Sequence, residues 1–159
     1  MSTNKPKNEL DAADRTILRL LQQDGTLSNP RLAEQLALSV TPCWRRLKRL
    51  EDDGYIKDYQ ANLDRRKLGL DVLAFVQIRF SAHGGNEPNA FEAAMCAQPQ
   101  VLSCHKITGD ADYLLQVVAT SLDAYSDFVE NVLRQMPGVA SIHSSLALRE
   151  VKAGSRLPV

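Results

Sequence analysis

The stretch TPCWRRLKRLEDDGY, residues 41–55, concentrates positive charge in a chain whose formal net charge is zero. Four basic residues occupy five positions and three acidic residues follow: Arg45, Arg46, Lys48, Arg49, Glu51, Asp52 and Asp53. At about 100° of rotation per residue, this pattern predicts a helix with a divided surface. We expect Trp44, Leu47 and Leu50 to form the apolar arc and the four basic residues to lie opposite.

The basic side of this helix has two interpretations on the pattern alone. A charged helix surface is often simply solvated, and an Arg49–Asp53 pair at i, i+4 would suit that role. The alternative is contact with DNA, because Ser39, Thr41 and Pro42 are small enough for the first turn to approach base edges. Arginine and lysine bind phosphate, and arginine also pairs with guanine. Since the whole chain is neutral, DNA binding requires a local patch of this kind.

Two further helices are predicted before this one, at residues 10–25 and 28–39, each from an apolar stripe that follows a capping residue. The residues that mark them are Asp11 and Asp14 at the first N-terminus, Ile17, Leu20 and Leu21 in its stripe, Gly25 at its end, Ser28 and Pro30 at the second N-terminus, and Leu32 and Leu36 on its apolar face. Ser39 or Thr41 would cap the third helix, and Gly54 would end it. Residues 55–64, YIKDYQANLD, predict two short strands with a turn. This order is typical of a winged helix-turn-helix.

The second half of the chain predicts strands and helices in the order β-α-β-β-α-β, a ferredoxin-like arrangement. Alternation places Ala74, Val76, Ile78 and Phe80 of the first strand, residues 72–82, on one face. The other expected elements are helices at 88–98 (with Phe91, Ala94 and Met95 in its stripe) and 121–136 (with Leu122, Tyr125, Val129, Val132 and Met136), and strands at 101–109, 112–120 and 139–151. The fold class is α+β. The predicted divisions are a mobile tail at 1–9, the winged helix-turn-helix domain at 10–60, a hinge at 61–71, the ferredoxin-like domain at 72–151 and a C-terminal tail at 152–159.

Composition excludes several classes of protein. No stretch approaches the roughly 20 apolar residues of a membrane helix, and the polar N-terminus MSTNKPKNE is no secretory signal, so we expect a cytoplasmic, nucleoid-associated protein. The three cysteines, Cys43, Cys96 and Cys104, lack the spacing of a disulfide framework or a zinc site. The histidines, His83, His105 and His143, are isolated. Cys43 itself is expected to be an apolar filler beside Trp44, the alternative being a thiol activated by the helix N-terminus and the arginines.

Several segments in order resemble the Lrp/AsnC, or feast/famine, family of transcriptional regulators, to which leucine-responsive regulatory proteins belong. They are residues 10–56, ITGDADYLLQV at 107–117, MPGV at 136–139 and LREVKAGSRLPV at 148–159. The resemblance implies a winged helix-turn-helix joined by a β hinge to a ferredoxin-like domain, the RAM domain. It also implies dimers formed sheet against sheet, larger assemblies such as an octamer of four dimers, and a small amino-acid effector bound between dimers.

The function implied by this resemblance is sequence-specific regulation of amino-acid metabolism or transport genes. The expected partners are double-stranded DNA, an amino acid and further copies of the chain, with no membrane, cofactor, metal or catalytic residue. The residues expected to bind DNA are Ser39, Thr41, Pro42, Arg45, Arg46, Lys48 and Arg49. Two alternatives are an architectural nucleoid protein with little sequence preference and a tetrapyrrole decarboxylase like some relatives of the family. His105 and His143 are too few to support the decarboxylase.

The effector region of the family corresponds to TGDADY, residues 108–113. The residues expected to bind the effector are Thr108, Gly109, Asp110, Asp112 and Tyr113. A zwitterion needs a carboxylate near its ammonium group, which Asp110 and Asp112 can supply, and donors near its carboxylate, which the backbone around Gly109 can supply. The alternative is a polar turn between two strands. Many family members carry an aromatic residue where this chain has Ala111, and three alternatives follow: an enlarged pocket, a different ligand or a pocket without a ligand.

Overall fold

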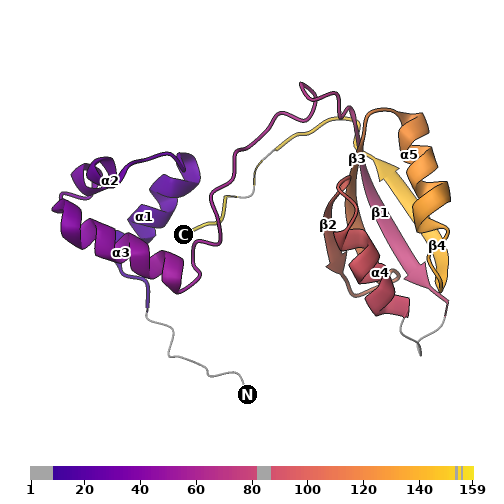
Figure 1. Cartoon of the computed structure of the whole chain (residues 1–159), viewed down its shortest axis with the longest axis horizontal. Helices are drawn as coiled ribbons and strands as arrows, with labels where there is room; N and C mark the ends of the chain where they lie inside the picture. The colour runs from indigo at the N-terminus through magenta and orange to yellow at the C-terminus, as the bar shows by residue number, and fades with distance from the viewer. Residues whose placement is uncertain (1–8, 82–86, 153, 155) are drawn as a thin grey trace, which may run out of the picture. The chain divides into compact units, whose positions relative to one another are not determined.

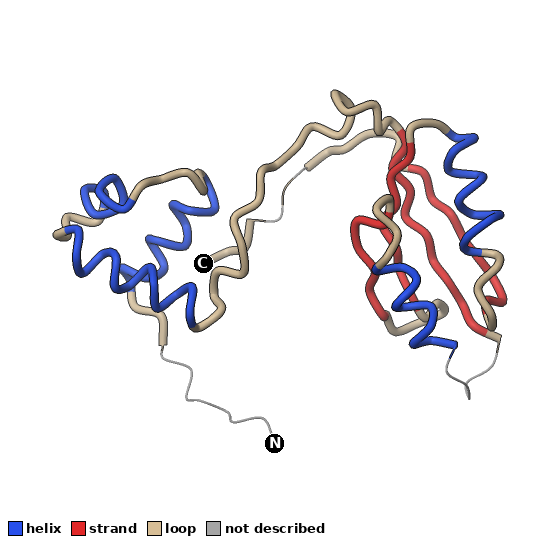
Figure 2. The backbone as a smooth tube through the Cα atoms, viewed as in Figure 1, coloured by secondary structure: helices blue, strands red, loops and turns tan. Residues whose placement is uncertain are grey.

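The chain consists of two compact units, which are described separately (Figure 1, Figure 2). The computed structural model describes residues 9–81, 87–152, 154 and 156–159. The predicted tail is described only at Glu9, and His83 also lies outside these residues. The helical unit comprises Met1–Asn62 with Gly154–Val159, and the sheet unit comprises Leu63–Ala153.

The helical unit contains α1 (Ala12–Gln23), α2 (Asn29–Gln35) and α3 (Val40–Asp52). The N-cap predicted at Asp11 is confirmed, and with Asp14 it forms a capping box: the Asp14 amide donates to the Asp11 carboxylate at 2.8 Å and the Asp11 amide donates back to Asp14 at 3.2 Å. Ser28 and Ser39 stand at the N-caps of α2 and α3, but neither side chain accepts a capping hydrogen bond. Gly54 ends α3 as predicted, at a positive φ of 75° that glycine adopts without strain.

Two small clusters of buried side chains form the core of the helical unit. Ile17, Leu18 and Leu50 join α1 to α3, while Leu32, Ala33 and Cys43 join α2 to α3. The last residues of the chain belong to the same unit. The Leu157 amide donates to the Gln22 side chain at 2.6 Å, and Val159 packs against the first cluster. The C-terminus therefore contributes to the packing of α1.

The two strands predicted at residues 55–64 are absent, so that prediction is wrong. A two-stranded hairpin is at best marginally stable unless it buries an apolar face. Tyr59 instead donates its hydroxyl to Glu51 at 2.9 Å, and its ring lies 3.7 Å from the position that a Cβ on Gly25 would occupy. These contacts hold the segment beside the helices without strand pairing.

The sheet unit follows the predicted βαββαβ order. Its elements are β1 (Val72–Phe80), α4 (Glu87–Cys96), β2 (Val101–Lys106), β3 (Tyr113–Ala119), α5 (Leu122–Phe128) with the π-helical turn η1 (Val129–Leu133), and β4 (Val139–Leu146). The strands pair antiparallel in the order β2-β3-β1-β4. Helices α4 and α5 cover one face of this sheet (Figure 1). The ferredoxin-like prediction is confirmed.

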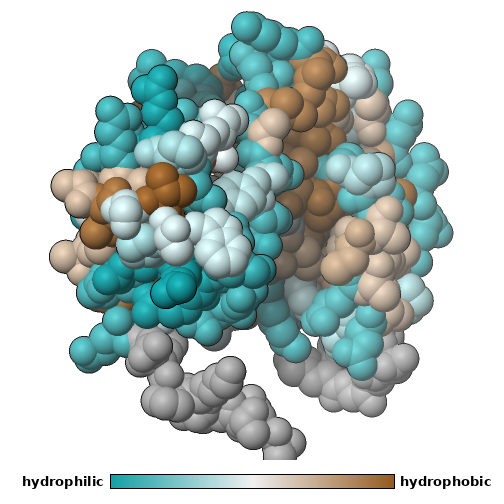
Figure 3. All heavy atoms as spheres, turned by 60° about the vertical axis from the view of Figure 1, so that its left-hand side comes forward, coloured by the Kyte–Doolittle hydropathy of each residue, from teal (hydrophilic) through white to brown (hydrophobic). Residues whose placement is uncertain are grey.

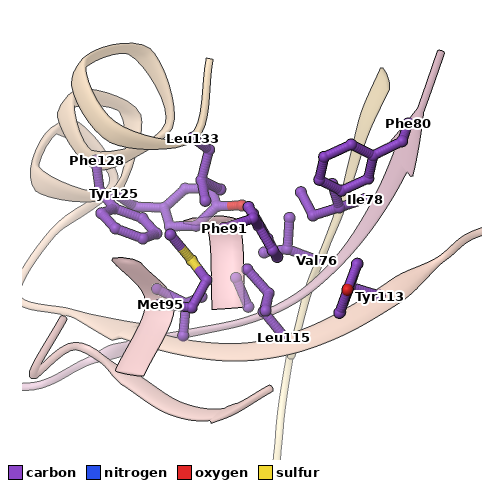
Figure 4. Packing of buried hydrophobic residues seen from close by; sticks show 12 residues of the cluster. Val76, Ile78, Phe80, Phe91, Met95, Tyr113, Leu115, Tyr125, Phe128 and Leu133 are labelled. Carbon is purple, nitrogen blue, oxygen red and sulfur yellow. The ribbon is translucent and has the colours of Figure 1, made fainter. Parts of the chain in front are cut away.

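The core of the sheet unit lies between the sheet and these helices (Figure 4). The alternation predicted for β1 is confirmed, because its four inward residues are all buried: Ala74, Val76, Ile78 and Phe80. Phe91 of α4 meets Phe80 edge to face, with ring centroids 5.5 Å apart, and meets Tyr113 at 5.0 Å. Such aromatic pairs add about 0.5–1.5 kcal/mol to the free energy of burial.

The apolar stripe predicted for residues 121–136 is partly wrong. Tyr125 is buried as expected, and Val129, Val132 and Met136 pack against the core, but Leu122 is 58% exposed, and Phe128 and Leu133 are also buried. The burial of Leu133 follows from η1, in which the Arg134 amide donates to the Val129 carbonyl five residues earlier. A π-helical turn contains an extra residue, so it shifts the phase of every side chain that follows.

Candidate DNA interface and effector pocket

Helix α3 turns two of its four basic residues toward α1. Arg46 Nη1 lies 2.5 Å from Asp11 Oδ2 and 3.0 Å from Asp14 Oδ1, and Arg49 bonds the other oxygen of Asp14. Asp14 is fully buried, while both arginine side chains are about one-third exposed. The expectation that all four basic residues face outward with no nearby acid is therefore wrong for Arg46 and Arg49.

Helix geometry explains this difference. At about 100° per residue, Arg46 lies about 40° from the buried Leu50, whereas Trp44 lies about 120° from it. Arg46 thus belongs to the inward half of α3, and Trp44 does not belong to the apolar arc. The Trp44 side chain is indeed 50% exposed.

The outer face of α3 is formed by its remaining exposed residues. These are Val40, Thr41, Pro42, Trp44, Arg45, Lys48 and Asp52, and the exposed Ser39 precedes them at the N-cap. Within the described part of the chain Arg45 has no ion-pair partner, and Lys48 pairs with Asp52 at 2.8 Å instead of the Arg49–Asp53 pair expected for a solvated face. The hydrogen bond to Asp52 raises the pKa of Lys48. Because both partners are exposed, this pair is weak enough for a phosphate to replace Asp52.

Cys43 is a structural residue, as predicted. Its side chain is fully buried between α2 and α3. Burial raises the pKa of its thiol, which disfavours the reactive thiolate. The filler interpretation of Cys43 is thus confirmed.

The predicted effector region, residues 108–113, is fixed to the end of β1 by Asp112. The Asp112 amide donates to the Ile78 carbonyl at 2.9 Å, and Asp112 Oδ2 accepts the Phe80 amide at 2.8 Å. Gly109 has a φ of 112°, a conformation that side chains rarely adopt. One Asp112 oxygen is therefore engaged in holding the loop over the end of β1.

Two neighbouring pockets of the sheet unit lie beside this loop. One of about 210 Å³ is lined by Gln77, Arg79, Asp110, Ala111, Ser141 and His143. The other, of about 330 Å³, is lined by Arg79, Phe80, Ser81, Gly109, Asp110 and Asp112. We call the first the β1/β4 pocket, since most of its residues come from those strands. Arg79 and Asp110 line both pockets.

The structure separates the five residues predicted to bind an effector. Gly109, Asp110 and Asp112 line a pocket, whereas Thr108 is exposed and lines neither of the two. Tyr113 is buried on the opposite, helix-covered face, where its hydroxyl donates to Glu92 at 2.6 Å. Burial, followed by the bond to Glu92, raises the pKa of Tyr113. Tyr113 is therefore a core residue in this structure.

Four pocket residues were missed by the sequence analysis: Gln77, Arg79, Ser141 and His143. The alternation of β1 already implied that Gln77 and Arg79 point away from the helices. The pairing of β1 with β4 was not readable from sequence. In the structure Gln77 lies opposite His143 and Arg79 lies opposite Ser141, which creates the floor of the β1/β4 pocket.

The described residues hold neither a cluster of metal-ligating side chains nor a membrane-spanning helix. They contain no group of three or more His, Cys, Asp or Glu side chains placed to hold a metal ion. No described helix combines the length and the apolar character that crossing a membrane requires.

The helical unit has the architecture of a DNA-binding domain, and the sheet unit, with its pockets beside one loop, has that of a ligand-binding domain. Comparison with known proteins agrees with both assignments. Residues 10–57 match the winged helix-turn-helix DNA-binding model, and residues 73–157 match the Lrp/AsnC ligand binding domain. The chain belongs to the Lrp/AsnC family of DNA-binding transcriptional regulators.

Individual relatives support this assignment. The chain is 44% identical to the Bkd operon transcriptional regulator of Pseudomonas aeruginosa, covering 95% of this chain and 99% of that protein. It is 40% identical to the transcriptional activator DecR of Escherichia coli K12, covering 94% and 99%. A transcriptional regulator from Neisseria meningitidis, solved as a complex with L-methionine, superposes with a TM-score of 0.90 at 40% identity, covering 94% and 97%. These relatives support neither the architectural nor the decarboxylase alternative.

Proposed function

We propose that this regulator binds double-stranded DNA through the outer face of α3 and responds to a free amino acid bound by the sheet unit. The observation that supports the DNA contact is the position of Arg45 and Lys48. Both lie on the exposed side of the third helix, beyond a small first turn, while the opposite side packs on α1 and α2. A third helix with this exposure is the element that enters the major groove in helix-turn-helix proteins.

The basic residues of α3 divide into two roles in this proposal. Arg45 and Lys48 bind phosphates or guanine edges, and Ser39, Thr41 and Pro42 allow the first turn to approach the bases. Trp44 joins this face because of its exposure. Arg46 and Arg49, which sequence alone placed among the DNA contacts, hold α3 against α1 through Asp14. In this proposal Arg46 and Arg49 fix the orientation of α3, while Arg45 and Lys48 make the contacts with DNA.

We infer that copies of the chain assemble through the face of the sheet that the helices leave uncovered. Phe75 on that face is 40% exposed, and hydrophobic surface gathers into a band on the sheet unit (Figure 3). A second copy packed there would form a dimer, and dimers would associate further, to octamers. Such a dimer presents two α3 helices to half-sites about 34–36 Å apart, or a multiple of that distance.

The amino-acid response rests on the family and on the loop pocket. The Neisseria relative was solved in complex with L-methionine, and the matched family domain is a ligand-binding domain. In this chain the pocket residues include one carboxylate and one guanidinium, the two groups that a zwitterion requires. On those grounds we infer that this protein also binds an amino acid.

The DNA contact is tested with a duplex selected from a randomised pool by the unaltered protein. Its affinity is measured as a function of salt for the wild type, Arg45→Ala and Arg149→Ala, the last being an exposed arginine of the sheet unit. Loss of one phosphate contact should lower affinity and reduce the slope of log K against log salt by about 0.9. Arg149→Ala should match the wild type. An unchanged slope and affinity for Arg45→Ala would remove Arg45 from the interface.

A companion measurement separates a regulator from an architectural protein. The ratio of specific to non-specific binding is measured at one fixed salt concentration with the selected and a scrambled duplex. Specific regulators typically show ratios of about 10³ or more. A ratio close to one would favour binding through the phosphate backbone alone and would contradict sequence-specific regulation.

A further inference from the structure

Residues 156–159, which we call the RLPV segment, lie against α1 in the helical unit (Figure 1). Gln22 of α1 bonds both backbone groups of Leu157: its Oε1 accepts the Leu157 amide at 2.6 Å, and its Nε2 donates to the Leu157 carbonyl at 3.1 Å. Arg19 of α1 donates from Nη2 to the backbone oxygen of Val159 at 3.5 Å. Gln22 and Leu157 are 135 residues apart, so proximity in the sequence does not bring them together.

Gln22 recognises the backbone of the RLPV segment. A side-chain amide has one acceptor group and one donor group, so it satisfies the N–H and C=O of a single residue at once. The side chain of Leu157 takes little part, since Leu157 is 70% exposed. Pro158 follows Leu157, and a residue before proline is disfavoured in helical backbone, which biases Leu157 toward an extended conformation before it docks. The segment therefore loses less conformational freedom on docking.

Val159 supplies the apolar part of the contact. Its side chain packs against the buried cluster of Ile17, Leu18 and Leu50. Leu50 belongs to α3, so the RLPV segment reaches the packing between α1 and α3. A unit of about 60 residues buries only about 60% of the surface that its unfolded chain exposes. One further apolar side chain is therefore a substantial addition to this small core.

Few contacts hold the RLPV segment compared with those that hold the helices. In the part of the chain that the structure describes, its attachment consists of the hydrogen bonds of Gln22 and Arg19 and the packing of Val159. Leu157 and Pro158 remain exposed. Regions with few buried contacts and exposed hydrogen bonds open at a lower free energy than global unfolding requires. The segment can therefore leave α1 while the helices stay folded.

We propose that the RLPV segment is a detachable strap, a segment that docks on α1 through its backbone and Val159 and supports the packing of α3. The sheet unit, Leu63–Ala153, separates α1 from this segment in the sequence. The strap therefore gives the sheet unit a second connection to the helical unit besides the linker, and its release loosens the α1–α3 pair. The effect on DNA affinity rests on the proposed DNA contact of α3, whereas docking itself does not.

Hydrogen exchange of the full chain without DNA tests docking and detachment together. The Leu157 amide should exchange about tenfold or more slowly in the wild type than in Gln22→Ala, which removes both bonds to Leu157. Gln23→Ala, at the neighbouring exposed glutamine, should match the wild type. Equal Leu157 rates in the wild type and Gln22→Ala would show that the segment does not dock. A Leu157 rate as slow as that of central α1 amides would show a permanent part of the fold and no strap.

Loss of the apolar contact gives an independent variant. Val159→Ser should lower the urea midpoint of the Trp44 fluorescence transition by about 0.5–1 M. Val151→Ser makes the same change at a residue of the sheet unit that is 84% exposed, and it should leave the midpoint unchanged. Gln22→Ala should also lower the midpoint, but not in a chain without residues 156–159, because changes to one shared contact are not additive. Additive losses would mean that Gln22 acts within α1 alone, which would overturn docking.

DNA binding at one fixed salt concentration tests the connection to α3. Removal of residues 156–159 should weaken the selected duplex by about fivefold or more, and saturating duplex should slow Leu157 exchange by about the same factor, because coupling between two equilibria is reciprocal. A wild type that binds no duplex specifically would remove the proposed DNA contact and leave the docking results intact. A wild type that binds the duplex without either effect would overturn the proposed support of α3 by the strap.

Discussion

The two units of this regulator differ in where their charged side chains lie. In the helical unit Asp14 is fully buried and bonded to Arg46 and Arg49, so a charged residue forms part of the interior. In the sheet unit the described buried residues are all apolar or tyrosine, and the notable charges, Arg79 and Asp110, lie at the surface without ion-pair partners.

This contrast distinguishes structural charges from candidates for binding. A carboxylate without access to water is tolerated when partners replace its hydration, which is what the two arginines do for Asp14. Arg79 and Asp110 remain hydrated, so leaving them unpaired costs little free energy and keeps both groups available for a ligand. A count of arginines on α3 would therefore overstate its DNA-binding charge, because two of them are engaged by α1.

The largest effect is expected from loss of volume in the sheet unit. Phe91→Ala removes the ring that contacts Phe80 and Tyr113, and it should lower the free energy of unfolding by about 3–5 kcal/mol. Far-ultraviolet circular dichroism in urea measures the loss. Trp44, the single tryptophan of the chain, lies in the helical unit, so its fluorescence transition should be unchanged. Equal losses by both probes would show that the units unfold together.

A smaller loss is expected when the buried charge of the helical unit is removed. Asp14→Asn keeps the shape of the side chain but leaves Arg46 and Arg49 without their counter-charge. We expect a loss of about 2–4 kcal/mol, less than for a fully buried pair because both guanidinium groups reach water. The Trp44 transition in urea reports it. Asp52→Asn, which breaks the exposed pair with Lys48, should change stability by less than about 0.5 kcal/mol and serves as control.

Local patterns in the sequence predicted the elements that short-range chemistry determines. The capping box at Asp11 and Asp14, the β1 alternation and the βαββαβ order all follow from residues close together in the chain. The ion pair of Arg46 with Asp14 and the floor of the β1/β4 pocket depend on contacts between distant segments. Asp14 and Arg46 are 32 residues apart, and the pairing of Gln77 with His143 depends on strand register. The π-helical turn places Leu133 in the core, and the helical spacing of Leu122 and Tyr125 does not predict that turn.

The site residues also divide into those predictable from a contiguous segment and those brought together by folding. The polar loop around Asp110 was recognisable because it is contiguous in sequence. Arg79 was not, because its relevance depends on Asp112 bonding to both of its neighbours. The inward position of Arg46 on α3 could have been predicted from sequence. At about 100° of rotation per residue, Arg46 lies only about 40° from the buried Leu50.

A more modest effect is expected for the exposed tryptophan of α3. If the outer face enters DNA, adding the selected duplex should change Trp44 emission directly. Trp44→Ala should weaken binding of that duplex by about twofold to fivefold, less than the roughly 1–3 kcal/mol of a bidentate base contact. Its stability should change by less than about 0.5 kcal/mol, because the side chain is half exposed. Emission that does not respond to saturating DNA would place Trp44 outside the interface.

The smallest effect concerns the acid stability of the same unit. The Asp14 amide, and after it Arg46, lower the pKa of Asp11 below its ordinary value of 3.8. The folded state therefore favours the ionised carboxylate, so its contribution is fully present above pH 3.8 and is lost as pH falls through the lower folded value. The Trp44 urea midpoint should decline over that range, and Asp11→Asn should decline less steeply. Asp24, whose pKa Thr26 lowers, acts with the same sign, so adding Asp24→Asn should flatten the profile further. Identical slopes for Asp11→Asn and the wild type would mean that the pKa of Asp11 is the same in the folded and the unfolded chain, which would contradict the lowered folded value.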